Sequence, residues 1–386
     1  MHYSFLCDAH GSVNPFFHFF STPTKKNGEM SQPEFLPIQW KSTFLSLLDQ
    51  RVLPGKKEFL QIQTMEETIV AIREMAVRGA PAIAITGIFG ITLGAKKKSG
   101  NSNPVDVDSL IKQVFESRPT AVNLSFALKE AKKRVEGVSH WDSIAKVWES
   151  YALEMMVQDL KANQTLGKNG ADLFPKNQNE FHIITHCNTG ALATAGHGTA
   201  LGVIRSLRDQ GKKVVVYADE TRPFLQGSRL TAFEMMEEGI ECYIITDGMS
   251  GWLMNHRKID AVLVGCDRVA TNGDTANKIG TYNLAIVAYE HKVPFYVCAT
   301  KDSFDLKLKT GDEIPIEMRK ESEVTQFDFL KNEEGNFLFP EGKTSPIGAR
   351  ALNPSFDITK AKFIKNFITE LGCFVPEEIS FRLKNV

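Results

Sequence analysis

A thiol and a carboxyl group stand out in this sequence as groups that could do chemistry together. Cys187 follows the apolar run 181–186, and Asp267 follows the apolar run 261–266. Each run is typical of a strand, and the carboxyl ends of parallel strands open into a crevice where α/β proteins bind ligands. We therefore expect both side chains to face one cavity, which binds a small phosphorylated ligand.

Cys187 is a candidate catalytic thiol because it lies between a predicted strand and a helix predicted from residue 191. The positive end of a helix dipole lowers the pKa of a nearby thiol and favours the thiolate. The alternative is a buried structural cysteine, with Asn188 and Thr189 capping the helix.

Asp267 is a candidate general acid or base, because a carboxyl group at a strand end can lose solvent, which raises its pKa. Asn277 and Lys278 follow a Gly-Asp turn and are predicted to begin the next helix. A helix start with a lysine offers backbone N–H groups and a cation to a phosphate.

The loop 219–229, after the apolar run 213–218, holds two acids, two arginines and an amide. Pairing of acids with arginines within the loop is an equally good account of Asp219, Glu220 and Arg222. Gln226 precedes a predicted helix and could direct its amide at a ligand oxygen.

Two arginines of the helical first half, Arg78 and Arg118, each precede a predicted helix. A single arginine is usually a surface charge. Two at helix starts, together with Lys278, favour an anion site.

The elements around these loops predict an α/β fold in which a helical domain precedes a parallel-sheet domain. Apolar runs that alternate with helical patterns are typical of a parallel sheet covered on both faces. We expect a mostly helical domain over residues 30–175 and an α/β domain over 176–386, with 1–29 as a flexible extension or an unused upstream start. The predicted helices are 64–77, 79–95, 104–117, 119–136, 139–169 and 359–372, Pro81 and Pro119 lie in first turns, and the predicted strands are 181–186, 213–218, 241–246, 261–266 and 294–299.

Composition limits the partners and cofactors. The chain has 386 residues, 42% hydrophobic content and a net charge of −1, so neither a nucleic acid nor a membrane is an expected partner. Six widely spaced cysteines without a CxxC motif favour a reduced, cytoplasmic protein. The glycine-rich stretch 196–202 has the wrong spacing for a dinucleotide fingerprint and lies inside a predicted helix. Histidines form no HxH or HExxH pattern, so we expect no cofactor and no metal.

Five segments resemble the methylthioribose-1-phosphate isomerase family, within a superfamily that includes initiation factor 2B regulatory subunits. They are RGAPAIAITGIFG (78–90), SRPTAVNL (117–124), THCNTGALATAG (185–196), ETRPFLQGSRLTAFE (220–234) and GCDRVATNGDTANKIGTYNLA (265–285). The resemblance spans residues 35–372 and implies a helical N-terminal domain, a Rossmann-like C-terminal domain and a homodimer. It also implies conversion of 5-methylthioribose 1-phosphate into 5-methylthioribulose 1-phosphate in methionine salvage.

The resemblance assigns a role to each matching position. It makes Cys187 and Asp267 catalytic, with Asp267 giving a proton to the ring oxygen and Cys187 acting as a base through an enediol or stabilising a hydride shift. The family's Gly-Ala-Asp-Arg stands here as Gly-Cys-Asp-Arg over residues 265–268. The implied substrate-binding residues are Arg78, Gly79, Ala80, Arg118, Gln226, Asn277 and Lys278.

Two other functions remain open. A sister isomerase would act on ribose 1,5-bisphosphate or 5-deoxyribose 1-phosphate and would differ in its pocket for the C5 substituent. A regulatory subunit of the translation-factor type would share the scaffold without catalysis. The presence of both Cys187 and Asp267 argues against this second alternative.

Overall fold

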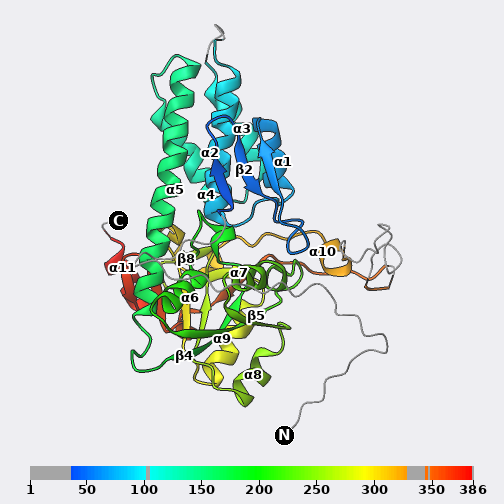
Figure 1. Cartoon of the computed structure of the whole chain (residues 1–386), viewed down its shortest axis with the longest axis vertical. Helices are drawn as coiled ribbons and strands as arrows, with labels where there is room; N and C mark the ends of the chain where they lie inside the picture. The colour runs from blue at the N-terminus through cyan, green and yellow to red at the C-terminus, as the bar shows by residue number, and fades with distance from the viewer. Residues whose placement is uncertain (1–35, 101–104, 328–343, 347, 385–386) are drawn as a thin grey trace, which may run out of the picture. The chain divides into compact units, whose positions relative to one another are not determined.

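The computed structural model describes residues 36–100, 105–327, 344–346 and 348–384 (Figure 1). The extension predicted over residues 1–29 lies outside the described residues. No helix in the described ranges is long and apolar enough to cross a membrane.

The first part of the chain is a helical layer beside a small antiparallel sheet. Thr64 begins the first helix with a capping box: its hydroxyl accepts from the Glu67 N–H, and the Glu67 carboxylate accepts from the Thr64 N–H. The elements are β1 (Ile38–Trp40), β2 (Leu45–Leu48), β3 (Phe59–Ile62), α1 (Met65–Arg73), α2 (Ala80–Lys97), α3 (Val107–Ser117), α4 (Val122–Arg134) and α5 (Trp141–Ala171).

Helix α2 is the buried centre of this layer, as its uncharged sequence predicts. Every residue from 82 to 95 is buried. Pro81 lies in the first turn, as predicted, where a missing N–H does no harm. The same prediction for Pro119 is wrong, because α4 begins only at Val122.

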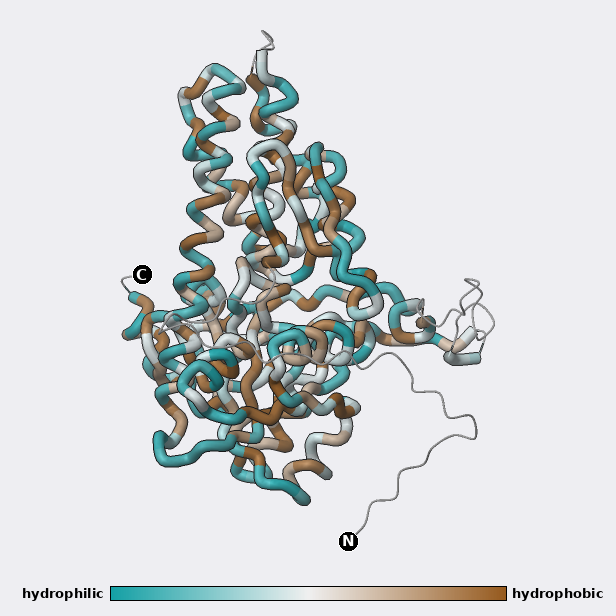
Figure 2. The backbone as a smooth tube through the Cα atoms, viewed as in Figure 1, coloured by the Kyte–Doolittle hydropathy of each residue, from teal (hydrophilic) through white to brown (hydrophobic). Residues whose placement is uncertain are grey.

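Helix α5 contributes to two cores. Trp148 packs in the core of the helical layer, whereas Leu166 packs in a core of the main sheet. Gly167 allows α5 to approach helix α6 (Ala200–Asp209) closely, because a Cβ there would lie 2.7 Å from the carbonyl oxygen of Gly202. Hydrophobic and hydrophilic positions alternate along α5 in Figure 2. The domain boundary predicted between residues 175 and 176 stays a prediction.

The second part is built on a seven-stranded sheet that is parallel except at β14. Its order is β14-β13-β10-β7-β4-β5-β6. The five runs predicted as strands are confirmed as β4, β5, β6, β7 and β10. The bounds are β4 (Glu180–His186), β5 (Lys213–Asp219), β6 (Glu241–Ile245), β7 (Ala261–Val264), β10 (Phe295–Cys298), β13 (Asn366–Thr369) and β14 (Gly372–Phe374), with helices α7 (Ala232–Glu237), α8 (Ser250–His256), α9 (Thr281–Glu290) and α11 (Ile379–Arg382).

Both faces of this sheet are covered, which explains why its strands are continuously apolar. Adjacent residues of β4 point to opposite cores: Ile183 packs in one and Ile184 in the other. The same holds for Phe367 and Ile368 of β13. The helix predicted over 359–372 is therefore wrong, because these neighbouring apolar residues serve two faces of a strand.

The strand order reverses between β4 and β7. From β4 the chain adds β5 and then β6 on one side, and it returns to place β7 on the other side of β4. The last residue of β4, His186, pairs with the last residue of β7, Val264. Ligands of open α/β sheets bind at such a reversal, beyond the carboxyl ends of the strands.

A four-stranded sheet, ordered β11-β8-β9-β12, follows β7. Its strands are β8 (Arg268–Ala270), β9 (Thr275–Lys278), β11 (Phe304–Asp305) and β12 (Phe356–Thr359). The predicted helix start at Asn277 and Lys278 is thus wrong: a turn at Gly273, whose φ is 86°, folds β9 back on β8. Helix α9 begins later, after Gly280. The predicted class, an α/β chain with a helical first part and a parallel-sheet second part, is confirmed.

Candidate active site

Cys187 lies immediately beyond β4, in an unusual backbone conformation. Its φ is 68°, and the residue is only 8% exposed. The Cys187 N–H donates to Thr221 Oγ1 at 2.8 Å, and Thr231 Oγ1 donates to the Cys187 carbonyl at 2.7 Å. These two bonds hold a left-handed conformation that a residue with a side chain rarely adopts.

The helix predicted from residue 191 is confirmed only in its second half. Residues 187–199 form a loop with a short 3-10 turn at Ala191–Ala193, and α6 begins at Ala200. The glycine-rich stretch 196–202 therefore lies largely in this loop. No helix dipole acts on the thiol from this side.

Gln226 contacts the thiol directly. Its Nε2 donates to Cys187 Sγ at 3.2 Å, and the residue is fully buried. Its Oε1 has no hydrogen-bond partner among the described residues. The sequence predicted that this amide faces the site, and the structure adds that it faces the sulfur.

Asp267 lies beyond β7, across the strand reversal from Cys187. Its backbone N–H donates to the Ala276 carbonyl at 2.9 Å, which ties it to the β8–β9 hairpin. Its side chain is exposed and has no hydrogen bond or ion pair with any described residue. Surrounding protein nevertheless displaces solvent and raises the pKa of the carboxyl group, while Lys278 and Arg118 oppose that rise. A carboxyl with a raised pKa is suited to donate a proton.

Lys278 links the two groups electrostatically. Burial lowers the pKa of its amine, and the charges of Cys187 and Asp267 raise it. Its Nζ donates to the Ser355 carbonyl at 2.8 Å and lies 4.8 Å from the centre of the Phe356 ring. The thiol and the carboxyl thus act on one amine.

Four cations line one pocket together with Gln226: Arg78, Arg118, Lys278 and Arg319, of which Arg319 is paired with Glu323. Burial lowers the pKa of Arg118, and the charges of Arg319 and Arg78 lower it further. Arg78 Nη1 is buried and has no partner within the described part of the chain. Repelling cations and an unused donor are what an anion site requires.

Gly79 and Ala80 bring this cationic pocket close to the thiol. Gly79 has a φ of 87°, and a Cβ there would lie 2.3 Å from the carbonyl oxygen of Ala193 in the loop after Cys187. Ala80 begins α2. Asn277 is placed differently: its buried side chain donates to Thr281 Oγ1 at 3.0 Å, at the start of α9.

The sequence interpretation missed the segments that complete the pocket. The pocket is lined by Glu317, Arg319 and Glu323 from the irregular, charged segment 304–350, by Asn353, Ser355 and Phe356 beyond it, and by the apolar side chains of Met75, Pro223 and Phe224. Arg319 Nη2 lies near Glu323 Oε1 at 2.5 Å and near Met75 Sδ at 3.6 Å. The high density of charged residues over 317–323 was the sequence signal that could have indicated this part of the pocket.

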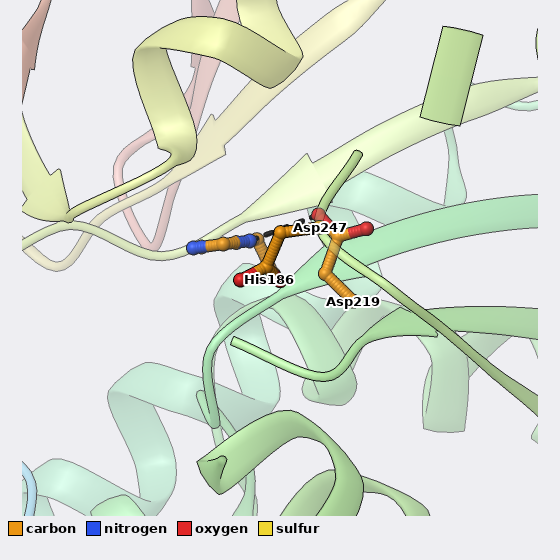
Figure 3. Close-up of side chains that lie close together, drawn as sticks. All are labelled: His186, Asp219 and Asp247. Carbon is orange, nitrogen blue, oxygen red and sulfur yellow. Dashed lines mark hydrogen bonds and ion pairs between the residues drawn. The ribbon is translucent and has the colours of Figure 1, made fainter. Parts of the chain in front are cut away.

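Among the described residues, one largely buried cluster offers metal-ligand atoms. His186, Asp219 and Asp247 each contribute one such atom, and these atoms lie within 4.8 Å of one another (Figure 3). His186 Nδ1 and Asp219 Oδ2 are 2.9 Å apart. Asp219 therefore pairs with a histidine, and the alternative of pairing with an arginine of its own loop is wrong.

The chain belongs to the initiation factor 2 subunit family, whose model matches residues 76–376. Among its relatives is the methylthioribose-1-phosphate isomerase of Leptospira interrogans, which is 55% identical over 351 residues that cover 90% of this chain and 96% of that protein.

Two solved structures share this fold at 35% sequence identity. One is 5-methylthioribose 1-phosphate isomerase from Pyrococcus horikoshii OT3, with a TM-score of 0.79 over 90% of this chain and 94% of that one. The other is the delta subunit of translation initiation factor eIF-2B from A. fulgidus, with a TM-score of 0.77 over 91% of this chain and 100% of that one. Structural similarity alone therefore does not separate the enzyme from the translation factor.

Proposed function

We propose that this chain is an aldose–ketose isomerase that converts 5-methylthio-α-D-ribose 1-phosphate into 5-methylthio-D-ribulose 1-phosphate in methionine salvage. The observation that carries the proposal is the placement of Cys187 and Asp267 on opposite sides of the strand reversal. The charges of both residues raise the pKa of Lys278. The isomerase from Leptospira interrogans, at 55% identity, supports the same reaction.

Arg78, Arg118 and Lys278 hold the phosphate in this proposal. None of the three forms an ion pair with an acid among the described residues, whereas Arg319 is neutralised by Glu323. Binding a phosphate here relieves the repulsion between the cations. It also fixes C1 of the sugar, because the phosphate is bonded to C1, and fixed geometry favours the reaction of a transient open-chain form.

Asp267 then donates its proton to the ring oxygen. The bond between C1 and the ring oxygen breaks with its electrons on oxygen, which leaves C1 electron-poor and still bonded to the phosphate. The hydrogen on C2 moves to C1, and the C2 hydroxyl loses its proton as it becomes the ketone. One proton enters and one leaves, so Asp267 can be reprotonated within the same turnover.

Cys187 acts at the transfer between C2 and C1. As a thiolate it removes the C2 proton to give an enediol and returns the proton to C1, or it stabilises a direct hydride shift. Gln226, which donates to Cys187 Sγ at 3.2 Å, stabilises the negative sulfur in either route.

The substituent at C5 separates this reaction from that of a sister isomerase. Met75, Pro223, Phe224 and Phe356 give the pocket an apolar wall, which favours a methylthio group over a second phosphate. The test offers purified protein a panel of pentose 1-phosphates with methylthio, hydrogen or phosphate at C5 and follows ketose formation by NMR. We expect fastest turnover of the methylthio sugar; turnover of the bisphosphate alone would overturn the substrate, and no turnover of any sugar would favour the translation-factor class.

We further propose a cytoplasmic homodimer. The five cysteines in the described ranges are free, as in a reducing compartment. The edge strand β6 and the helices α8 and α9 expose a set of large apolar side chains, which a second copy would cover: Tyr243, Ile244, Met249, Trp252, Ile286 and Tyr289. Sedimentation velocity should give twice the chain mass of 43.1 kDa, and a mass of one chain would contradict the dimer.

A further inference from the structure

A buried ion pair lies directly behind the thiol. The side chains of His186 and Asp219 are each 1% exposed, and Nδ1 and Oδ2 lie 2.9 Å apart. His186 Nε2 is 2.9 Å from the Ile279 carbonyl oxygen. Because a carbonyl oxygen only accepts, Nε2 must carry a hydrogen.

Nδ1 carries a hydrogen as well. Burial lowers the pKa of His186, but the hydrogen bond to Asp219 and the charges of Asp219, Asp247 and Cys187 raise it to about 9. Asp357 is also near enough for the charge of His186 to lower the pKa of its carboxyl, although burial of Asp357 raises that pKa overall. At neutral pH the ring is therefore an imidazolium that lies near the carboxyl groups of Asp219 and Asp247 and near Cys187.

This ring joins the three segments that carry the site. His186 is the residue before Cys187 at the end of β4, and Asp219 ends β5, ahead of the loop with Gln226. Ile279 follows Lys278, at the end of β9. Gly280 permits this contact, since a Cβ there would lie 2.8 Å from the His186 ring.

A second path connects Asp219 to the backbone of Cys187. Thr221 Oγ1 donates to the Asp219 carbonyl at 2.9 Å and accepts from the Cys187 N–H. Asp247 fixes that threonine by accepting from the Thr221 and Arg222 N–H groups, both at 2.7 Å. The His186–Asp219 pair is therefore connected to the Cys187 backbone twice. His186 is the preceding residue, and Asp219 is linked to the Cys187 N–H through Thr221.

A proton explains this cluster better than a metal ion. His186 Nδ1 and Asp219 Oδ2 already satisfy each other at a hydrogen-bond distance, and both oxygens of Asp247 accept backbone N–H groups. A cation would have to displace the proton that the pair shares.

We propose that His186 and Asp219 form a positioning pair whose imidazolium holds the ends of β4, β5 and β9 in register and keeps a positive charge beside Cys187. The charge favours the thiolate, and the bond to Ile279 fixes Lys278 relative to the thiol. The effect on turnover rests on the proposed function, whereas the effect on the thiol does not.

The test therefore has two readouts, turnover and the pH dependence of Cys187 alkylation by iodoacetamide, followed on the Cys187 peptide by mass spectrometry. We expect His186→Gln and Asp219→Asn to lower kcat about 10- to 100-fold and to move alkylation to higher pH. Asp219→Asn keeps the shape of the pair, so it decides the outcome if His186→Gln fails to fold. His182→Gln, on the same strand but near its other end and half-buried, is the matched control and should match the wild type in both readouts.

Three results would overturn the proposal. The first is a folded Asp219→Asn variant with unchanged kcat and unchanged alkylation. The second is loss of activity to a chelator with recovery on adding Zn²⁺, which would show that the cluster holds a metal ion. The third is a fall in kcat without any change in alkylation, which would leave the pair a purely structural role. If the wild type turns over no sugar phosphate yet the alkylation shift appears, the proposed function fails and the positioning pair stands.

Discussion

The buried amide of Gln226 donates to the sulfur of Cys187 at 3.2 Å. A hydrogen bond to a charged acceptor contributes about 1.5–3 kcal/mol, so the amide stabilises the thiolate over the thiol. Gln226→Leu fills similar space without the donor. We expect kcat for the sugar phosphate to fall about tenfold or more, as steady-state kinetics would show. The control is Gln178→Leu, because Gln178 precedes β4 and lies at the opposite, amino end of the strands. Unchanged kcat in a folded Gln226→Leu protein would mean that the sulfur needs no such partner.

Lys278 should act mainly in binding. Its amine lies beside Arg78 and Arg118 in the same pocket, where a phosphate replaces cation repulsion with attraction. Lys278→Ala should raise KM about tenfold or more and weaken inhibition by inorganic phosphate. Lys213→Ala removes an exposed lysine from the start of β5 and should leave both quantities unchanged. An unaltered KM in Lys278→Ala would place the phosphate elsewhere.

Gly79 is required for close packing against the loop after Cys187. A Cβ at Gly79 would lie 2.3 Å from the Ala193 carbonyl oxygen, at a φ of 87°. Gly137 has a φ of 77° with nothing within 4 Å of its Cβ position, so Gly137→Ala reports the backbone strain alone. We expect Gly79→Ala to lower the free energy of unfolding by about 1–3 kcal/mol more than Gly137→Ala, and to lower kcat as well. Urea unfolding measures the difference. Equal losses of unfolding free energy in the two variants would show that the loop after Cys187 moves to make room for the Cβ at no cost in stability.

The His186–Asp219 pair predicts a loss of stability in alkali. The pKa of His186 rises from 6.5 to about 9 in the folded chain because of Asp219, so the folded state binds this proton more tightly than the unfolded state. That contribution is complete below about pH 6.5 and is lost as the pH rises through 9. Between pH 7 and pH 10 the free energy of unfolding should therefore fall more steeply for the wild type than for His186→Gln. Parallel curves for the two proteins would rule out the raised pKa.

The sequence predicts the strands of the main sheet and the residues at their ends better than the segments around them. Runs such as 181–186 and 261–266 are buried on both faces, so their apolar character and their length identify them. Position at a strand end then makes Cys187 and Asp267 candidates without any knowledge of the fold. Gln226 and Lys278 also reach the site, although Lys278 arrives on a strand rather than at a helix start.

The rest depends on contacts between distant segments. Residues 187–199 are small and apolar enough to form a helix, but the bonds of Cys187 to Thr221 and Thr231 hold a loop instead. Arg319 and Phe356 reach the pocket from a region without apolar periodicity. His186 looks like the last polar residue of a strand, and only the approach of Asp219 and Ile279 gives it a role.

The central claim is that Cys187 and Asp267 work on one sugar phosphate. The most direct measurement is kcat for 5-methylthioribose 1-phosphate, followed by NMR, in Cys187→Ser and Asp267→Asn, with Cys242→Ser as the control and ligand-induced thermal stabilisation as proof of binding. We expect each variant to bind the sugar phosphate while kcat falls at least about 10²-fold, and we expect Cys242→Ser to keep wild-type kcat. Near wild-type turnover in either Cys187→Ser or Asp267→Asn would contradict the central claim.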